Sequence, residues 1–269
     1  MKTVLTLNSI KQIEKQYNTG ELPVLVVCSD KKSYICKYMR SSSAAYKLAS
    51  EFIGSQMIEE WGIESPSLAL VQIKNIHWTN NIVTTRNLSA PAIGYLKLEG
   101  VIDITPTTCN VVTQTDRLLI QLLKIALFDF WIANEDRTYN NANLLYDIQN
   151  SNLVSIDYGG ILNTSTFEYP LSQLTTTDTI LYADIFRHLS QNVRNQTIQK
   201  YASNLRSYYD ESIVKCRMKF STIAEMIPSE WNISSTVINS KLNQLVDTEW
   251  IENVWDNFIE CLNENLSNE

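Results

Sequence analysis

The sequence has 269 residues, of which 44% are hydrophobic and 19% are charged, and these proportions are typical of a folded globular protein. Its formal net charge of −7 disfavours a broad basic surface, so no nucleic-acid partner is expected, whereas a local anion site remains compatible with it. Only seven glycines and two histidines are present. They form no G-x-x-x-x-G-K-[ST] or G-x-G-x-x-G phosphate loop and no H-E-x-x-H zinc site.

The cysteines and the apolar segments exclude further classes of protein. The five cysteines are widely spaced and form no C-x-x-C pair, so neither a zinc knuckle nor a redox dithiol is expected. Scattered thiols suit a reducing compartment, and we therefore expect a cytoplasmic protein. Charged residues interrupt both the first 16 residues and the most apolar stretch, residues 118–133. The sequence therefore predicts no signal peptide and no membrane span.

The first hundred residues show mixed strand and helix patterns. A β-rich run over Leu22–Cys28, a polar turn and an alternating run over Ser33–Met39 predict a hairpin, with Lys37 near the end of its second strand. Apolar residues at helical spacing then predict an amphipathic helix over Ser43–Trp61, which Gly62 is well placed to end. Further strands are predicted over Ser67–Ile73, Ile82–Thr85 and Ala92–Leu98.

The second part of the chain is predicted to be mainly helical. Asp116–Ile132 is a strongly apolar helix, and an asparagine-rich loop separates it from two short strands, Leu144–Tyr146 and Leu153–Ile156. Amphipathic helical stretches follow over Ile180–Leu189, Val193–Leu205, Glu211–Met226 and Val237–Leu262. We therefore predict an α+β protein with two lobes, a β-rich one over residues 1–100 and a helical one over residues 101–269.

Three polar residues follow the apolar helix at a distinctive spacing. Asp136 is followed five residues later by Asn141, and Asp157 stands directly before Tyr158 and a glycine pair, beyond the two short strands. Phosphoryl transfer needs a carboxylate that orients the attacking hydroxyl, and hard oxygen ligands that hold Mg²⁺ against the nucleotide phosphates. An Asp-x-x-x-x-Asn segment followed by an Asp-aromatic-Gly segment is the order found in kinase loops.

A lysine and a glutamate precede these loops in the order that a kinase requires. Lys37 lies on the predicted hairpin and Glu51 lies on the helix that follows it. Each has a simpler interpretation. Lys37 could be an ordinary solvated lysine, and Glu51 could form an i,i+4 surface pair with Lys47.

In these segments the sequence resembles the HipA-like kinases, a protein-kinase-like family that includes bacterial toxin-module serine/threonine kinases. The resemblance covers roughly residues 22 to 231 and is most specific in the segment W-I-A-N-E-D-R-T-Y-N-N, which contains Asp136. The other similar stretches are Ser50–Val71, Ser155–Gly160 and Ile227–Trp231. The resemblance implies a stand-alone kinase domain of α+β class, with a small β-rich N-lobe and a larger helical C-lobe.

The resemblance also implies a role for each candidate residue. Asp136 would be the catalytic base, Asn141 and Asp157 would hold Mg²⁺, Lys37 would contact the phosphates of ATP, and Glu51 would pair with Lys37. Asn143 could serve as a second polar ligand. The acceptor would be a serine or threonine hydroxyl of an unidentified protein, and an antitoxin-like partner is possible. No membrane partner is expected.

Two alternatives stay open at this stage. A small-molecule kinase of the aminoglycoside or choline type shares the Asp/Asn/Asp pattern, but usually has a histidine two residues before the first aspartate, where this chain has Asn134. The other alternative is a pseudokinase that acts as an interaction module. It is favoured by the scarcity of glycine before Lys37, where Gly20 is the single glycine, because a glycine-rich lid uses its backbone N–H groups to hold phosphate.

Overall fold

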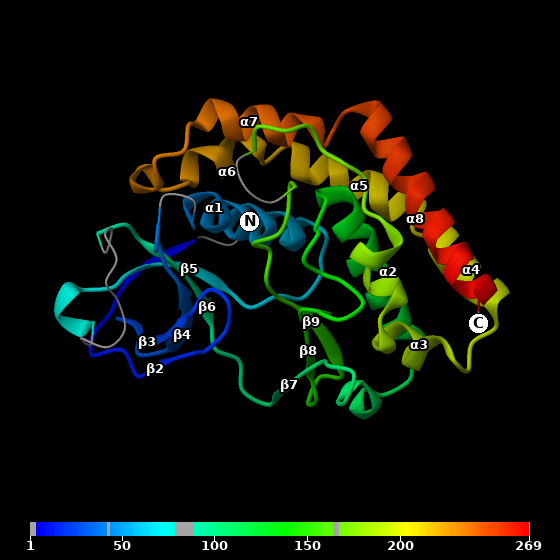
Figure 1. Cartoon of the computed structure of the whole chain (residues 1–269), viewed down its shortest axis with the longest axis horizontal. Helices are drawn as coiled ribbons and strands as arrows, with labels where there is room; N and C mark the ends of the chain where they lie inside the picture. The colour runs from blue at the N-terminus through cyan, green and yellow to red at the C-terminus, as the bar shows by residue number, and fades with distance from the viewer. Residues whose placement is uncertain (1–3, 42–43, 79–88, 164–166, 269) are drawn as a thin grey trace.

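The computed structural model describes residues 4–41, 44–78, 89–163 and 167–268. The described residues form a six-stranded sheet near the N-terminus, a three-stranded sheet in the middle of the chain and a helical region that continues to the C-terminus (Figure 1). The strands of the large sheet are β1 (Leu5–Asn8), β2 (Lys15–Gln16), β3 (Val24–Val27), β4 (Ser33–Lys37), β5 (Leu68–Gln72) and β6 (Ala92–Leu96).

The large sheet has the order β1-β5-β6-β4-β3-β2. Its pairings are antiparallel except for β1, which runs parallel to β5 with Leu5 opposite Ala69. The β3–β4 hairpin places Lys37 opposite Ile93 of β6, next to the centre of the sheet. Strand β4 lies between β3 and β6, and Lys37, its last residue, is paired with β6.

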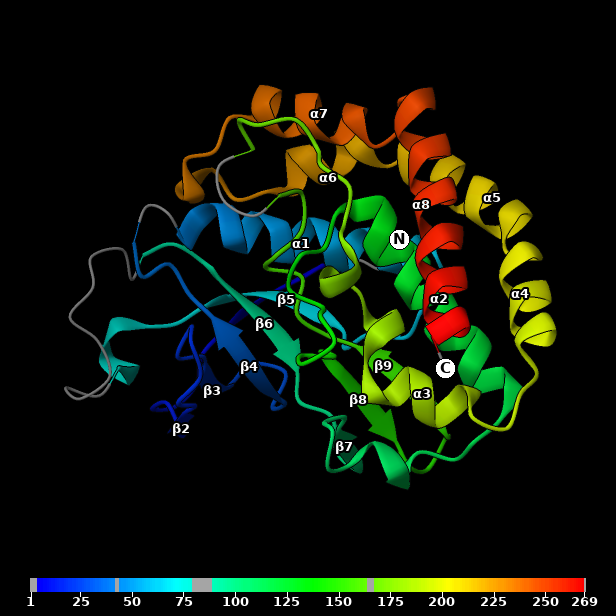
Figure 2. The same ribbon diagram turned by 45° about the vertical axis from the view of Figure 1, so that its right-hand side comes forward.

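Helix α1 (Ala44–Glu60) joins the sheet to the helical region. It contacts β6 on one side and helix α5 (Arg206–Arg217) on the other (Figure 2). The remaining helices are α2 (Asp116–Ile132), α3 (Asp184–Ser190), α4 (Asn195–Ser203), α6 (Phe220–Met226), α7 (Ser235–Gln244) and α8 (Thr248–Asn268). No helix in the described ranges has the length and apolar character needed to cross a membrane.

The small sheet has the order β7-β8-β9 and packs beside α2. Its strands are β7 (Val101–Asp103), β8 (Leu144–Asp147) and β9 (Asn152–Ser155), all antiparallel. Because β8 and β9 form a hairpin, the start of β8 and the end of β9 lie at the same end of this sheet. The connection from α2 enters the sheet there, and the segment after β9 leaves it there. The loops that carry Asp136 and Asp157 are therefore brought side by side.

The predicted hairpin, the helix ending before Gly62 and the apolar helix over Asp116–Ile132 are confirmed. The predicted strand at Ile82–Thr85 lies outside the described residues. Three predicted helical stretches are each divided in two. Ala183 is extended and separates a short 3₁₀ turn from α3, and a turn at Met218 separates α5 from α6. The third division falls at Asp247, whose side chain accepts a hydrogen bond from the Glu249 N–H at 2.9 Å and caps α8.

An aromatic cluster fixes the end of α1 to the helical region. Trp61, almost completely buried, packs against Phe128 and Trp131 of α2 with ring centroids 5.2 and 5.5 Å apart, and against Tyr208 and Tyr209 of α5. Burying aromatic rings in such pairs is strongly stabilising. Because α1 also carries Glu51, the cluster fixes the position of that side chain relative to the loops after α2.

The approach of α1 to the segment after β9 depends on a glycine. A Cβ atom added at Gly54 would lie 2.6 Å from Cγ of Tyr158, which is far inside van der Waals contact. Tyr158 follows Asp157 and is completely buried. The missing side chain at Gly54 therefore lets α1, which carries Glu51, pack directly on the segment that carries Asp157.

We expect Gly54→Ala to lower the free energy of unfolding by about 1–3 kcal/mol, because overpacking outweighs the better helix propensity of alanine. The measurement is the melting temperature. Gly20→Ala is the control, since a Cβ there meets nothing within 4 Å. A Gly54→Ala protein as stable as the wild type would contradict this close packing.

Candidate active site

A cleft of about 940 Å³ lies between the large sheet and the loops that follow α2 and β9. Four of the five residues singled out from the sequence line it, namely Lys37, Asp136, Asn141 and Asp157. Glu51 is buried behind it. The end of the cleft near β7 is lined by the apolar side chains of Ile35, Leu96, Leu98, Val101, Leu145 and Ile156. The cleft thus has an apolar end and an end that carries charged groups.

Lys37 occupies the centre of the charged end. Its ammonium forms an ion pair with Glu51, lies 2.7 Å from Oδ1 of Asp157 and 3.6 Å from Oε2 of Glu21. Burial alone would lower the pKa of Lys37, but the carboxylates of Glu51, Asp157 and Glu21 outweigh it and raise the pKa above its usual range. Lys37 is therefore a fixed positive charge.

Glu51 links four parts of the fold. Its side chain is completely buried and accepts hydrogen bonds from Lys37, from the Tyr95 hydroxyl and, at 3.0 Å, from the Tyr158 N–H. Burial raises the pKa of Glu51 and the Lys37 ammonium opposes that shift. The alternative interpretation of Glu51 as a surface partner of Lys47 is wrong, because Glu51 is buried against Lys37 and Lys47 pairs with Glu21 instead.

A buried ion pair shapes the loop after α2. The Arg137 guanidinium is completely buried and its Nε lies 2.8 Å from Oδ2 of Asp129 in α2. The same guanidinium donates hydrogen bonds to the carbonyl oxygens of Ala142 and Asn143, at 2.8 and 2.5 Å, and to the Ser155 hydroxyl at 2.7 Å. One side chain thereby ties α2, the loop and β9 together.

Asp136 lies on the loop that this arginine holds. Asn134, completely buried, donates to Oδ1 of Asp129 at 2.8 Å and accepts from the Asp136 N–H at 3.3 Å. On the other side, the Asn143 amide donates to the Asp136 carboxylate at 3.3 Å, and the Asn141 amide donates to the Asp136 carbonyl oxygen at 3.1 Å. The backbone and the side chain of Asp136 are both oriented before any substrate contact.

Gly160 allows the two loops to touch. A Cβ atom there would lie 2.5 Å from Cβ of Asp136, and the Gly160 carbonyl oxygen accepts a hydrogen bond from the Glu135 N–H at 3.0 Å. Asp157, just before the glycine pair, has a φ of 61°, in the left-handed region that most residues avoid. The tight backbone here places the carboxylates of Asp136 and Asp157 in the same cleft.

The pKa values of these two carboxyl groups are shifted in opposite directions. Burial raises the pKa of Asp136, and the negative charge of Asp157 adds to the shift. Burial would also raise the pKa of Asp157, but the Lys37 ammonium outweighs it and lowers that pKa to about 2. One carboxyl group is thus suited to take up a proton while the other stays ionised.

The donor set fits a hard divalent cation held partly by phosphates. Asp157, Asn141 and Asn143 line the charged end of the cleft, and their side chains carry a carboxylate and two amide oxygens. Among the described residues, no group of three or more His, Cys, Asp or Glu side chains could hold a metal by itself. A site of two or three oxygen donors is what Mg²⁺ uses when nucleotide phosphates and water complete its octahedron.

The loop over the charged end is residues 17–23, between β2 and β3. Gly20 is its one glycine, and the turn is closed by the Leu22 N–H donating to the Thr19 carbonyl oxygen at 2.9 Å. Its acidic side chain, Glu21, points to Lys37 and, at 3.1 Å, to Lys47. The glycine-rich lid is therefore replaced by a short loop with a carboxylate at its tip.

Sequence reasoning missed several residues that build this site. They are Glu21, Lys47 as a cleft residue, Tyr95, Asp129 and Arg137. Signals existed for Asp129, a charged residue inside a strongly apolar helix, and for Arg137, which stands in the W-I-A-N-E-D-R segment next to Asp136. The partners of Glu21, Lys47 and Tyr95 are far away in the sequence, and no local pattern identifies them.

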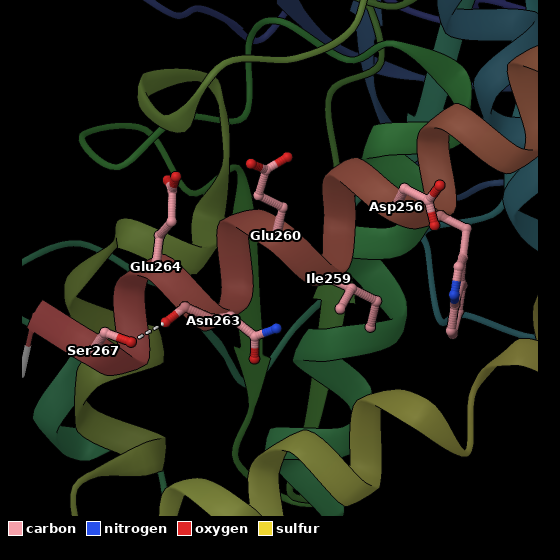
Figure 3. Close-up of a pocket in the computed structure, with 7 residues that line it drawn as sticks. Asp256, Ile259, Glu260, Asn263, Glu264 and Ser267 are labelled. Atoms are coloured by element: carbon pink, nitrogen blue, oxygen red, sulfur yellow. Dashed lines mark hydrogen bonds between the residues drawn. The ribbon is translucent and has the colours of Figure 1, made fainter.

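A second hollow lies on the outer face of α8 (Figure 3). Its lining comes from this one helix and includes Asp256, Glu260 and Glu264, with Asn263 and Ser267 joined by a 2.8 Å hydrogen bond from the serine hydroxyl to the Asn263 carbonyl oxygen. None of the residues that line the cleft belongs to it. All the candidate residues that line the cleft therefore lie outside this hollow.

Comparison with known proteins agrees with this geometry. The family model for "HipA-like kinase" matches residues 10–258. The chain belongs to the HipA-like kinase family. A solved structure of the Helicobacter pylori proinflammatory kinase CtkA is similar, with a TM-score of 0.57, 13% identity, and coverage of 95% of this chain and 99% of that one. The bilobal, protein-kinase-like fold expected for this HipA-like kinase is confirmed.

Two structures of the Golgi casein kinase, one with Mn/ADP bound, are less similar. Each has a TM-score of 0.45 and 9% identity, and the alignments cover 97% of this chain and 76% or 74% of theirs. No curated protein matches the sequence.

We expect Arg137→Lys to lower the free energy of unfolding by about 3–5 kcal/mol, because lysine cannot replace the guanidinium contacts and leaves buried groups unpaired. Denaturant titration measures the loss. The matched control is Arg206→Lys, whose partly exposed pairs with Asp210 and Glu252 should contribute at most about 1 kcal/mol. Equal losses for the two variants would refute the role given to Arg137.

Proposed function

We propose that this HipA-like kinase uses ATP and Mg²⁺ and transfers the γ-phosphoryl group to a serine or threonine hydroxyl of a protein. The observation that carries the proposal is that the carboxyl groups of Asp136 and Asp157 line one cleft together with Lys37, which lies 2.7 Å from Asp157. In addition, the pKa of Asp136 is raised and that of Asp157 is lowered. A raised pKa suits a proton acceptor and a lowered one suits a metal ligand.

The other residues bind and orient the nucleotide. Lys37 would contact the α- and β-phosphates, and Glu51 would hold Lys37 in place, as their ion pair supports. Asn141 and Asp157 would hold Mg²⁺, with Asn143 as a further amide close by. When bound, the cation neutralises charge that develops on the β,γ-bridging oxygen. The apolar end of the cleft would take the adenine ring.

In the transfer step, the carboxylate of Asp136 accepts a hydrogen bond from the acceptor hydroxyl and then its proton. The hydroxyl oxygen forms a bond to the γ-phosphorus, and the bond from that phosphorus to the β,γ-bridging oxygen breaks. The electron pair of the broken bond leaves on ADP. The Asn143 amide and the Asn134 carbonyl hold Asp136 in place during this exchange.

The choice of a protein acceptor is supported by the resemblance and by Asn134. Small-molecule kinases of the aminoglycoside type usually have a histidine at this place, whereas Asn134 is buried here and bridges Asp129 and the Asp136 backbone. Incubation with labelled ATP, first with a cell lysate and then with small hydroxyl compounds, separates the two classes. Label on proteins supports the proposal, and label on small compounds alone contradicts it.

A nucleotide-binding pseudokinase is the second candidate, and the lid favours it. Residues 17–23 have one glycine, and Glu21 at the tip of this loop lies against both cleft lysines. Mg²⁺-dependent stabilisation by ATP without any transfer of label to protein or water would support this candidate.

We expect Asp136→Asn to lower kcat by about 10²–10⁴-fold while leaving the dissociation constant for ATP within a few-fold, because the amide cannot accept the proton. Transfer of labelled phosphate and equilibrium binding of ATP measure the two effects. The control is Asp147→Asn, since Asp147 lies on β8 outside the cleft, is partly exposed and pairs with Asn150. An Asp136→Asn enzyme as fast as the wild type would refute the assignment.

The pH dependence of kcat provides a separate test. A base works only when it is deprotonated, so its activity is present above its pKa and is lost as the pH falls through that value. Because the pKa of Asp136 is raised, we expect the acidic limb of the profile to lie above the value of about 3.9 typical of a free aspartate. The residual activity of Asp136→Asn should lack this limb. A wild-type rate that rises as the pH falls would contradict the mechanism.

A further inference from the structure

A second lysine reaches the charged end of the cleft. Lys47 lies in the first turns of α1, four residues before Glu51, and its side chain is about half exposed. It lines the same cleft as Lys37, Asp136 and Asp157. Because residues four apart share one face of a helix, the face that buries Glu51 also directs Lys47 to the cleft.

One carboxylate spans the two lysines. Oε1 of Glu21 lies 3.1 Å from Nζ of Lys47, and Oε2 lies 3.6 Å from Nζ of Lys37. The same Oε1 would lie 3.9 Å from a Cβ atom at Gly159, so Glu21 reaches down to the segment after Asp157. An anion between two ammonium groups marks a position where phosphate oxygens would also be favourable.

We propose that Lys47 is a second phosphate-binding residue, which takes the γ-phosphate of the nucleotide, and that Glu21 is the carboxylate that the phosphate displaces. The inference rests on the proposed function, because it needs ATP in this cleft. It adds a residue for the terminal phosphate and gives the lid loop an electrostatic role.

Glu21 is the carboxylate best suited to leave. Glu51 is fully buried and accepts three hydrogen bonds, and Asp157 lies close against Lys37 and is placed to hold the cation. Glu21 is about one-third exposed, stands on the loop of residues 17–23 and makes ion pairs that solvent weakens. Displacing the Glu21 side chain therefore costs less free energy than displacing that of Glu51 or Asp157.

The charges in the cleft require such a displacement. A triphosphate brings several negative charges to an end that already holds Glu21, Glu51, Asp136 and Asp157 around two lysines. Lys47 and Asp136 line the same cleft, so the charge of Lys47 acts at the end where Asp136 lies. A cation there would hold the γ-phosphate beside the attacking hydroxyl.

The experiment compares the dissociation constants for ATP, ADP and adenosine, each with and without Mg²⁺. We expect Lys47→Ala to weaken ATP binding by about tenfold or more, ADP less and adenosine not at all, because a charge-assisted contact to the γ-phosphate is lost. Lys47→Arg should restore most of the ATP affinity. Glu21→Gln should strengthen ATP binding with or without Mg²⁺ and leave adenosine unchanged.

An exposed ion pair outside the cleft provides matched controls. Lys11 and Glu14 lie 2.5 Å apart, and Lys11→Ala and Glu14→Gln should leave all three affinities unchanged. ATP binding by Lys47→Ala equal to that of the wild type would overturn the role of Lys47. Mg²⁺-dependent weakening of ATP binding by Glu21→Gln would make Glu21 a metal ligand and overturn its role as the displaced carboxylate.

The two proposals fail in different ways. If the proposed function is wrong, the wild-type protein binds no ATP or transfers no phosphate, whatever stands at residue 47. If only the present inference is wrong, the wild type binds ATP and transfers phosphate, and Lys47→Ala discriminates between ATP and adenosine as well as the wild type does. Should Lys47→Ala lower the melting temperature, Lys47→Gln retains the longer side chain and tests the same contact.

Discussion

The structure depends on one ammonium group that is shared among carboxylates from different parts of the fold. Lys37 comes from β4, Glu51 from α1 and Asp157 from the segment after β9, and each would be costly to bury without the others. Their mutual pairing fixes the sheet, helix α1 and the segment that carries Asp157 relative to each other. The Trp61 cluster and the close contact at Gly54 fix the position of α1, so that Glu51 can reach Lys37.

A second buried ion pair does the same for Asp136. Asp129 and Arg137 hold the loop after α2 against β9, and Asn134 and Asn143 then orient Asp136. The pKa values follow from this division. Asp157 lies against Lys37 and stays ionised. Asp136 is exposed at the cleft but partly desolvated, faces the charge of Asp157 and holds a proton more readily. The fold thereby assigns different chemistry to two identical side chains in one cleft.

Much of this arrangement could be predicted from the sequence because its signals are local. The helix over Asp116–Ile132 has an apolar pattern along its whole length, and the β3–β4 hairpin has alternation and a polar turn. Strand β1 was missed because its parallel partner β5 lies about sixty residues away and four residues give no clear period. Glu21 was missed for the same kind of reason, since a periodic pattern reports which face of a segment is buried and not which distant charge it meets.

The most direct test of the central claim is a crystal structure with a non-hydrolysable ATP analogue and Mg²⁺. We expect the adenine at the apolar end of the cleft, the phosphates beside Lys37, the cation on Asn141 and Asp157, and the pair of Lys37 with Glu51 retained. Phosphates bound away from Lys37, or Glu51 turned away from it in the complex, would contradict this arrangement.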